Sequence, residues 1–536
     1  MTVTAPYRSP ASPGRDGFPQ ALRAEFTKFR TVRGWVIAAV VGVLAMAGIG
    51  MLAGGGGGTS CQAAHVGADA QGGGGCGSFV SFTLGPGGEP VSDSFYFVRQ
   101  PLAGDGTVTG RVSSLTGLLP PPPSSSDGPQ VPGVQPWTKA GLIIKENLAQ
   151  GSAYAAVMVT AGHGVRMQWN YTGDTAGLPG TVGPTSPRWL RLTRSGDVIT
   201  GYDSADGAHW ARVGTVTLAG LPATAQVGLF AASPDYQQVS PHFGGGTSGS
   251  GGPTQDTAVF DHLGTSGGWT AGPWTGQPVG SPEMPGVDAY RQSGGRFTLT
   301  GQGDIAPVPA GHGGGPSDAA ATVSEYLIGT FVGLIALVVV AGLFVTTEYR
   351  RGLIRLTLAA TPGRGRVLAA KSVVAAAVGF AAGLLGAALA VLAGGAVTRG
   401  RGHYLFPISA TAEARVIIGT AVLAAFASVL ALAIGTIVRR SAATVAIVVI
   451  VIVLPYFIAV TQAVPLSAGN WLLRVLPAAG FALQQPYPAY GQVTGFLYTP
   501  SSGYFPLAPW AGLAVLAAWT AAALALAAYL LRRRDA

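Results

Sequence analysis

Residues 323–347 read VSEYLIGTFVGLIALVVVAGLFVTT, and the chain continues with Glu348, Arg350 and Arg351. A helix of about 20 apolar residues crosses the hydrocarbon core of a bilayer, and only a helix satisfies its own backbone hydrogen bonds there. The stretch therefore predicts a transmembrane helix that is followed by a basic flank.

Five other apolar runs resemble this one in length and composition. They are Trp35–Ala53, Val367–Val397, Arg415–Val438, Ala442–Val464 and Ala508–Leu531. A long polar insert, rich in glycine and tryptophan, separates the first run from the second. The sequence thus predicts a polytopic α-helical membrane protein with six transmembrane helices. A folded domain is inserted between helices 1 and 2, so it must lie wholly on one side of the membrane.

The composition supports a membrane protein. Hydrophobic residues make up 48% of the chain and charged residues 10%, whereas soluble domains carry about 25% charged residues. The net charge of +9 is unevenly spread, because Gly54–Glu325 contains 11 Lys+Arg and 18 Asp+Glu. The basic excess belongs to the membrane part, so we expect no nucleic-acid partner.

Basic residues flank alternate ends of the six runs. Cytoplasmic loops are enriched in Lys and Arg, and one orientation places 17 of these residues inside without conflict. These residues are Arg8, Arg15, Arg23, Lys28, Arg30, Arg33, Arg350, Arg351, Arg355, Arg364, Arg366, Lys371, Arg439, Arg440, Arg532, Arg533 and Arg534. We expect a multi-pass protein of the cytoplasmic membrane with both termini in the cytoplasm and residues 54–322 outside.

The first run has an alternative interpretation as a cleaved signal peptide, because Leu44-Ala45-Met46-Ala47 resembles a cleavage site. Its length and the long basic stretch before it favour a retained helix.

Cys61 and Cys76 are the only cysteines. They could form a disulfide in an oxidising exterior or remain free thiols, and their spacing does not indicate a metal site.

The stretch Ala21–Arg33 precedes the first apolar run. As a helix it places Leu22, Phe26 and Phe29 on one face and basic residues such as Arg30 around the other. This pattern is typical of a helix lying in the membrane interface, in contact with lipid.

Glycines four residues apart let transmembrane helices approach closely. Two such pairs occur, Gly329 with Gly333 and Gly379 with Gly383. We expect them to lie at helix–helix contacts, and we expect Pro455 to kink the fifth span.

The segment Thr347–Lys371 reads TEYRRGLIRLTLAATPGRGRVLAAK. With the stretch before the first span and the six-span layout, it resembles the membrane subunits of ATP-binding-cassette exporters of the second permease type (ABC-2), in the actinobacterial style. The resemblance covers the first 53 residues and roughly 323–536, including NWLLRVLPAAGFALQQP at Asn470–Pro486. It implies an elbow helix at the first stretch and an ATPase-contacting segment at 348–366. The implied coupling residues are Glu348, Arg350, Arg351, Arg355, Pro362, Arg364 and Arg366.

The chain has no ATPase motif of its own. A Walker A loop needs a glycine before its Lys-Ser or Lys-Thr pair, but Ala370 precedes Lys371 and Ser372. We therefore expect a transporter subunit that is not an enzyme and has no cofactor. The resemblance implies two copies of an ABC ATPase and a second permease subunit, identical or related, as partners.

The insert contains many short segments in which apolar and polar residues alternate, which is the strand signal. They predict an extracellular antiparallel β-sandwich, jelly-roll-like, over 78–265. We expect a cytoplasmic tail at 1–20, the elbow and first helix at 21–53, a Gly-rich linker at 54–77, a linker with possible extra strands at 266–322 and the remaining helices at 323–536. The predicted strands are Phe95–Gln100, Thr107–Leu115, Ala140–Lys145, Ala153–Thr160, Val165–Trp169, Trp189–Arg194, Val198–Asp203, Trp210–Leu218 and Ala225–Ala231, with Thr257–Leu263 after a flexible Gly244–Gly252.

The insert resembles concanavalin-like, laminin-G-like sandwiches of carbohydrate-associated proteins. The residues that carry this resemblance are FYFVRQPLAGDGTVTGRV (Phe95–Val112), WTKAGLIIKENLAQGSAYAAVMVT (Trp137–Thr160) and RWLRLTRSGDVITGYDSADGAHWARVGTVTL (Arg188–Leu218). The resemblance makes a cell-wall glycan a candidate partner.

Possible ligand contacts in the insert are the loop tryptophans Trp269 and Trp274. We interpret four other tryptophans as core residues: Trp137, Trp169, Trp189 and Trp210. Asp203 and Asp206 lie near an Asp-Gly hairpin and are interpreted as turn residues. No strand-borne carboxylate pair, which glycoside cleavage requires, is evident.

Two other functions remain as alternatives. A membrane-anchored lectin-like sensor needs only one or two spans, so six spans argue against it. An ion-coupled carrier needs ionisable groups at mid-membrane, whereas Glu325, Glu348, Glu413 and Arg415 all lie near span ends. We therefore expect an ABC exporter permease with an unidentified substrate.

Overall fold

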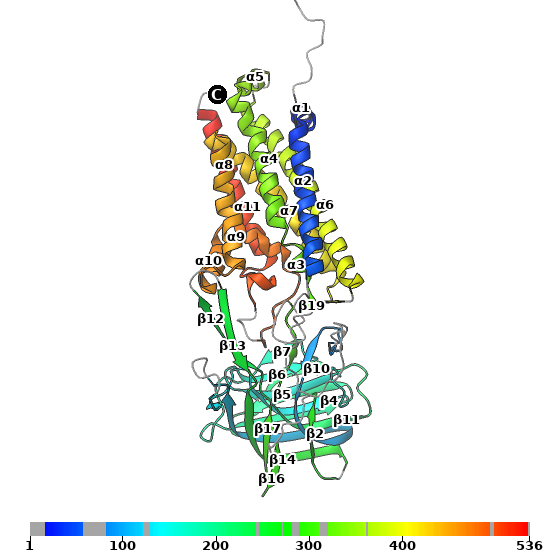
Figure 1. Ribbon diagram of the computed structural model, residues 1–536. Helices are drawn as coiled ribbons and strands as arrows, with labels where there is room; N and C mark the ends of the chain where they lie inside the picture. Colours follow the sequence, from blue (N-terminus) through cyan, green and yellow to red (C-terminus); the bar gives the residue numbers. More distant parts are fainter. Residues whose placement is uncertain are drawn as a thin grey trace, which may run out of the picture. The chain divides into compact units, whose positions relative to one another are not determined.

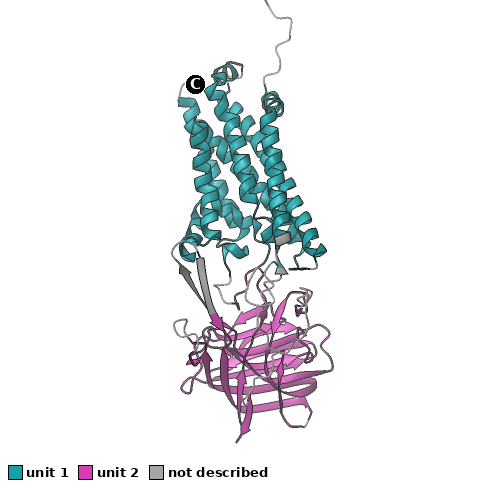
Figure 2. Cartoon of the chain, in the orientation of Figure 1, with its two compact units in different colours: residues 1–77, 319–487, 499–536 teal, residues 78–318, 488–498 magenta. Residues whose placement is uncertain are grey.

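A computed structural model describes residues 17–56, 82–121, 128–242, 246–270, 272–280, 289–310, 320–360, 363–401, 403–493 and 498–533. The chain divides into two compact units (Figures 1 and 2). The helical unit consists of residues 1–77, 319–487 and 499–536. The β unit consists of residues 78–318 and 488–498.

Among the described residues, the helical unit contains six helices that are long and apolar enough to cross a membrane, which confirms that prediction. They are Arg33–Gly54, Val323–Arg350, Arg364–Gly400, Ala410–Val438, Ser441–Val460 and Pro509–Arg533. Their elements are α2 (Arg33–Gly56), α3 (Val323–Tyr326) with α4 (Thr330–Arg350), α6 (Arg364–Gly400), α7 (Ala410–Val438), α8 (Ser441–Val448) with α9 (Leu454–Val460), and α11 (Pro509–Arg533). Shorter elements are α1 (Phe18–Thr31), α5 (Leu353–Ala360), α10 (Leu466–Val475), the 3-10 helices η4 (Pro477–Gln484) and η6 (Pro500–Ser502), and the paired strands β19 (Ala320–Ala321) and β20 (Tyr404–Leu405).

Helix α7 is the centre of the helical unit. In the most apolar stretch of α7, 72% of the residues are buried, whereas in that of α11 only 17% are buried. Leu423, Ala424, Ala427 and Leu430 of α7 pack into one core with residues from α2, α4 and α6. The small residues on α7 allow this, because small side chains let neighbouring backbones approach closely.

Two of the six spans are not single α-helices. The second is interrupted between α3 and α4. The fifth contains a π-helical turn, η3 (Val449–Val453), directly before the turn that holds Pro455. Proline lacks an N–H donor and its ring crowds the preceding turn, and π-turns occur where helical bonding is rearranged.

The β unit is dominated by one antiparallel sheet. Its main path runs β10 (Ala211–Thr217), β9 (Val198–Ser204), β8 (Arg188–Ser195), β2 (Phe95–Leu119), β11 (Thr224–Ala232), β4 (Lys139–Lys145), β5 (Tyr154–Thr160), β6 (Gly164–Trp169) and β7 (Gly173–Ala176). The strands β14 (Gln255–Trp269), β15 (Thr275–Val279), β16 (Tyr290–Ser293), β17 (Arg296–Gly301) and β3 (Val131–Pro132) join it off this path. Separate pairs are formed by β1 (Val91–Asp93) with β18 (Ile305–Pro307) and by β12 (Tyr236–His242) with β13 (Gly246–Gly252).

This sheet encloses the main core of the β unit. Val157 and Met167, from β5 and β6, pack in the same cluster as Leu190 and Leu192 of β8. A second cluster, which includes Ile143 of β4, covers the opposite face of β4 and β5. Alternate residues of these strands therefore face different apolar environments, as period-two side-chain geometry requires.

The structure corrects several strand predictions. The two strands predicted at 95–100 and 107–115 are one continuous strand, β2, because its first half pairs with β11 and its second half with β8. The predicted flexible linker at 244–252 contains β13, since backbone groups pair regardless of the side chains they carry. Strands β15 to β17 join the main sheet, so they are part of the β unit rather than of a linker.

Candidate coupling site and a recess in the helical unit

Helix α1 lies against the bundle through one edge. Phe29 is buried and packs edge-on against Phe344 of α4, with ring centroids 5.9 Å apart. Leu22 is partly buried in the same cluster. Phe26 is 52% exposed and does not share the packed edge, which corrects the single apolar face expected from the sequence. The residue that shares the packed edge is the buried Glu25.

Four charged side chains form a closed ring between α1, α4 and α6, here called the charge ring. Its members are Glu25, Lys28, Glu348 and Lys371. The Lys371 Nζ lies 2.7 Å from an oxygen of Glu25 and 2.7 Å from Oε1 of Glu348. The Lys28 Nζ lies 2.9 Å from Glu25 and 3.1 Å from Glu348. Each lysine therefore contacts both carboxylates, and α1 and the bundle each supply one acid and one base.

The charge ring is largely removed from solvent. The exposed fractions of the side chains are 2% for Lys371, 4% for Glu25 and 8% for Glu348, whereas Lys28 is 38% exposed. Burial by itself would lower the pKa of Lys28, but Glu25 and Glu348 outweigh it and raise that pKa. Ionised groups this deeply buried need close opposite charges, so separating α1 from α4 and α6 would be costly.

The charge ring lies next to the short helix α5. Lys28 donates a 3.4 Å hydrogen bond to Thr357 of α5, and Glu348 lies two residues before the end of α4. At the start of α6, Arg364 donates to the carbonyl of Leu531 at 2.8 Å, which ties this end of α6 to the last turn of α11. Figure 1 shows α5 and the start of α1 at the same end of the helical unit.

The predicted coupling residues differ in their surroundings. Arg350, Arg351 and Arg366 are exposed, as is Arg30 of α1, and Glu348 is buried. Pro362, Cys61, Cys76 and the side chain of Arg355 lie outside the described residues. Sequence reasoning missed the roles of Glu25, Lys28 and Lys371. An acidic residue inside the apolar edge of α1 was the available signal, since a buried carboxylate needs a partner.

The two predicted glycine pairs lie at helix contacts. A Cβ atom at Gly383 of α6 would come within 2.7 Å of the Cβ of Ala424 in α7, and one at Gly379 within 2.7 Å of the carbonyl of Ala424. A Cβ at Gly329 would come within 2.8 Å of the carbonyl of Met46 in α2, and one at Gly333 would meet the Met46 side chain. Larger residues at Gly329, Gly379 or Gly383 would meet backbone atoms of the neighbouring helix and could not be accommodated without moving it, whereas at Gly333 the nearest atoms belong to the Met46 side chain.

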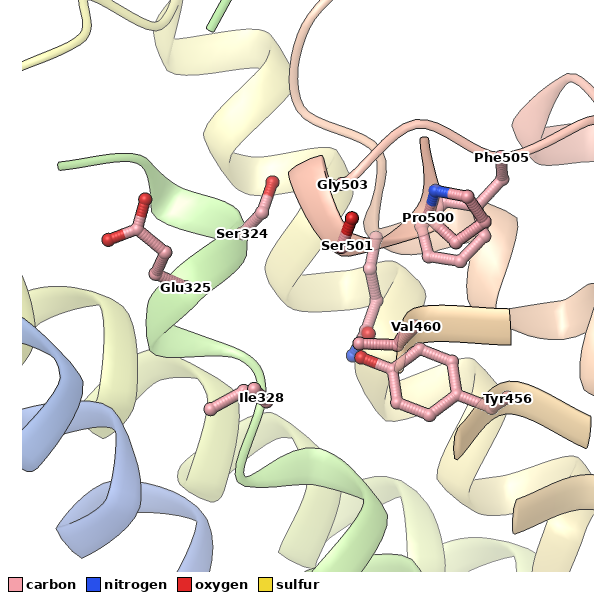
Figure 3. Close-up of a pocket in the computed structure, with 10 residues that line it drawn as sticks. Ser324, Glu325, Ile328, Tyr456, Val460, Pro500, Ser501, Gly503 and Phe505 are labelled. Atoms are coloured by element: carbon pink, nitrogen blue, oxygen red, sulfur yellow. The ribbon is translucent and has the colours of Figure 1, made fainter. Parts of the chain in front are cut away.

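A recess opens among α3, α9, η4 and η6 within the helical unit (Figure 3). It has an empty volume of about 410 Å³, including its open side. Tyr456, in the turn that follows the π-helical turn, is one lining residue, and its ring stacks on Phe481 with centroids 3.9 Å apart. The Glu325 carboxylate points away from Tyr456 and accepts hydrogen bonds from Thr322.

Four tryptophans of the β unit lie in surroundings other than those predicted: Trp189, Trp210, Trp269 and Trp274. Trp269 is the last residue of β14, and it packs with Trp274 against the main core rather than extending from a loop. Trp189 of β8 lies opposite Arg111 of β2 in the register, on the face away from that core. Trp210 precedes β10, and its ring lies 3.9 Å from the guanidinium of Arg191.

The remaining predictions for the β unit are partly corrected. Trp137 is buried and stacks on His163 with centroids 3.9 Å apart, and Trp169 packs against the main core. Asp206 accepts backbone hydrogen bonds in a turn, as predicted. Asp203, in contrast, is a buried residue of β9, and burial raises its pKa.

Comparisons with known proteins place the chain in a family. Residues 198–536 match the profile of a family described as "ABC-2 family transporter protein". No curated protein matches the chain.

Some solved structures are weakly similar. A functionally unknown protein from Saccharomyces cerevisiae is 15% identical, over 36% of this chain and 84% of its own, with a TM-score of 0.22. Scytalido-glutamic peptidase with a transition-state analogue inhibitor is 11% identical, over 40% of this chain and 100% of its own, with a TM-score of 0.24. A mutant of the GH43 protein BlXynB from Bacillus licheniformis is 14% identical, over 24% of each chain, with a TM-score of 0.16. Similarities this weak say nothing about the activity of this chain.

Proposed function

Because this chain belongs to the ABC-2 family of transporter proteins, we propose that it is the membrane-spanning subunit of an exporter powered by a separate ATP-binding-cassette ATPase. The observation that carries this proposal is that the charge ring lies beside α5. Helix α5 belongs to the 348–366 segment, which the resemblance assigns to ATPase contact.

The proposed mechanism transmits force through this end of the bundle. ATP-driven closure of two ATPase subunits would push on α5 and on the exposed Arg350 and Arg351. Lys28 contacts α5 through Thr357 and α4 through Glu348. Movement of α5 would therefore pass to α1 and α6 together rather than to one helix alone. A second permease subunit would complete the pathway.

In the proposed topology this end of the bundle faces the cytoplasm. Residues 54–322 are extracellular and contain a β-sandwich of the concanavalin-like kind, which the sequence places at 78–265. Support comes from the Lys and Arg residues of α1, of the α4–α6 connection and of the end of α11. A cysteine-labelling experiment tests it, with Cys61 and Cys76 changed to serine. An impermeant maleimide should label Ser195→Cys in intact cells and should leave Arg351→Cys unlabelled.

Co-purification in mild detergent tests the coupling site. The tagged chain is captured from its own cells, and the captured material is probed for a cassette ATPase. We expect the wild type and Arg474→Glu to retain the ATPase, because Arg474 lies in the last turn of α10, outside the 348–366 segment. Arg350→Glu should lose most of it. Equal retention by both variants would place the contact elsewhere.

The alternative function, a lectin-like sensor without transport, predicts a different result. Such a protein would bind its ligand with no ATPase attached and would stimulate no ATP hydrolysis. Reconstitution of the chain with the ATPase in proteoliposomes, followed by measurement of ATP turnover, separates the two functions.

A further inference from the structure

One face of the β unit is built from polar and aromatic side chains on β8, β9, β10 and β2. In β8, Leu190 and Leu192 point into the main core. Trp189 and Arg191 alternate with them and therefore lie on the opposite face. These two side chains are partly exposed. We refer to this side of the four strands as the arginine face.

The strand register aligns the side chains of the arginine face in rows. One row crosses all four strands: Arg212 of β10, Tyr202 of β9, Arg191 of β8 and Thr109 of β2. A second row is a ladder of hydroxyl groups, made of Thr215, Thr200, Thr193 and Thr107. Hydrogen bonds of 3.2 Å join Thr215 to Thr200 and Thr107 to Thr193. The face thus presents hydroxyl groups beside two guanidinium groups.

The two arginines of the first row have no carboxylate partner among the described residues. Arg191 lies 3.9 Å from the ring centroid of Trp210, and its Nε donates to Thr109 at 3.2 Å. These contacts hold the guanidinium in place while its other N–H groups make no hydrogen bond within the described chain. Arg212 is exposed. A fixed guanidinium with free N–H groups matches a planar carboxylate.

A third row limits the face on the β14 side. Arg111 lies opposite Trp189 and forms a two-pronged ion pair with Asp261, at 2.6 and 2.9 Å. The register of β14 then shifts between Asp261 and Gly264. His262 has a φ of 50° at this bulge, and its ring lies 5.2 Å from that of Trp189. Bulges redirect side chains, and the bulge in β14 places the exposed His262 side chain at the edge of the arginine face.

From this arrangement we propose that the arginine face binds an acidic polysaccharide, namely a chain that carries uronic-acid carboxylates. The guanidinium groups of Arg191 and Arg212 pair with carboxylates, the threonine ladder hydrogen-bonds to sugar hydroxyls, and the exposed parts of Trp189 and Tyr202 contact sugar rings. An extended, repeating polymer fits rows that cross a sheet. The proposal concerns the β unit and does not depend on the ATPase.

The test uses the full chain in detergent and three soluble polymers. Polygalacturonate carries the carboxylates, fully methyl-esterified polygalacturonate has the same backbone without charge, and polyglutamate has carboxylates without sugar. Binding is measured by microscale thermophoresis at low and at physiological salt, because charge pairing weakens as salt rises. The variants are Arg191→Gln, Arg212→Gln and Arg296→Gln, and the last removes the same charge from β17, which is not one of the four strands of the arginine face.

We expect the wild type to bind polygalacturonate and to bind the other two polymers at least roughly tenfold more weakly, the factor that one well-formed charged contact supplies. Arg191→Gln and Arg212→Gln should each weaken binding by roughly tenfold, and Arg296→Gln should not. Because Arg212 is exposed, Arg212→Gln should unfold at the same thermal midpoint as the wild type. Weaker binding by this variant then reflects the lost charge and not a loss of folding.

Several results would overturn the proposal. If the wild type does not bind polygalacturonate, the proposal is wrong. Equal binding of the esterified polymer shows that the carboxylates are irrelevant, and equal binding of polyglutamate shows recognition of charge alone. An equal loss in Arg296→Gln places binding away from the arginine face.

Discussion

Glu25 and Lys371 are separated by 346 positions in the sequence, and their charged atoms lie 2.7 Å apart. Glu25 belongs to α1, which precedes the first span, and Lys371 belongs to the first third of α6, where it is buried. The insert of more than 200 residues lies between them in the chain. This ion pair, with Lys28 and Glu348, joins the N-terminal helix to the rest of the helical unit by charge rather than by apolar contact alone.

We predict that Lys371→Met strongly destabilises the helical unit. The substitution leaves Glu25 and Glu348 buried without their main counter-charge, and breaking one side of a buried ion pair costs about 3–5 kcal/mol. Lys28→Met is the matched control. Lys28 is 38% exposed, so its loss should cost about 0–1 kcal/mol. Unfolding in detergent micelles, followed by tryptophan fluorescence, measures both.

The double variant Glu25→Gln with Lys371→Met gives a second test. If the two groups act as one pair, the double variant is less destabilised than the sum of the single variants. If Lys371→Met lowered the free energy of unfolding as little as Lys28→Met does, Lys371 would not be the centre of the charge ring.

The six spans could be predicted from the sequence because apolar length alone decides whether a helix can cross a bilayer. Most strands could be predicted because alternation records which strand face is buried. The continuity of β2 and the hairpin of β12 and β13 could not, since both depend on backbone pairing between strands rather than on local side-chain pattern. The charge ring could not either, because Lys28 and Glu348 are 320 residues apart.

The predictions for Trp189 and Trp269 were wrong for a different reason. Trp189 alternates with leucines and shares its strand face with Arg191, which was a local signal that it faces away from the core. Aromatic character alone predicts a core position for Trp189, and the alternation contradicts it. The two glycines before Trp269 predict a loop, whereas the sheet continues through them because β14 pairs with β2.

A second prediction concerns the contact between α6 and α7. Gly383→Ala should destabilise the helical unit by about 1–3 kcal/mol, because the added methyl group would lie 2.9 Å from the Cα of Ala421 and cannot be accommodated by side-chain rotation. Gly365→Ala is the control on the same helix, since nothing lies within 4 Å of its Cβ position. It should stabilise α6 by up to about 1 kcal/mol. Matching thermal midpoints for the two variants would show that α6 and α7 do not pack closely here.

A third prediction concerns Gln484 of η4. Its side-chain amide donates 3.0 Å hydrogen bonds to Thr330 of α4 and to Thr420 of α7. Gln484→Leu removes both buried bonds and should cost about 1–3 kcal/mol in the same unfolding assay. Gln462→Leu removes an exposed hydrogen bond to Ser501 and should have a much smaller effect. If the ranking were reversed, Gln484 would not connect the two helices.

The last prediction concerns the pH dependence of the β unit. Asp256 of β14 is fully buried, and no charged side chain among the described residues pairs with its carboxylate. Burial raises the pKa of Asp256 well above its usual value. The folded β unit therefore keeps a proton on this group over a pH range in which the unfolded chain, with a pKa of about 3.9, has lost it. The stabilising contribution of this proton is complete below a pH of about 3.9 and declines as the pH rises toward the raised value.

Asp256→Asn removes this dependence, because the amide has no proton to lose over that range. We expect the variant to be more stable than the wild type at neutral pH and to approach it near a pH of about 4, with unfolding of the full chain followed by tryptophan fluorescence. Asp206→Asn serves as a control of opposite sign. Asp206 is exposed, and its hydrogen bond with His209 lowers its pKa, so any stability it contributes declines as the pH falls. The free energy of unfolding of Asp256→Asn could instead differ from that of the wild type by the same amount at both pH values. Asp256 would then be ionised in the folded protein, and an unidentified cation would have to compensate its charge.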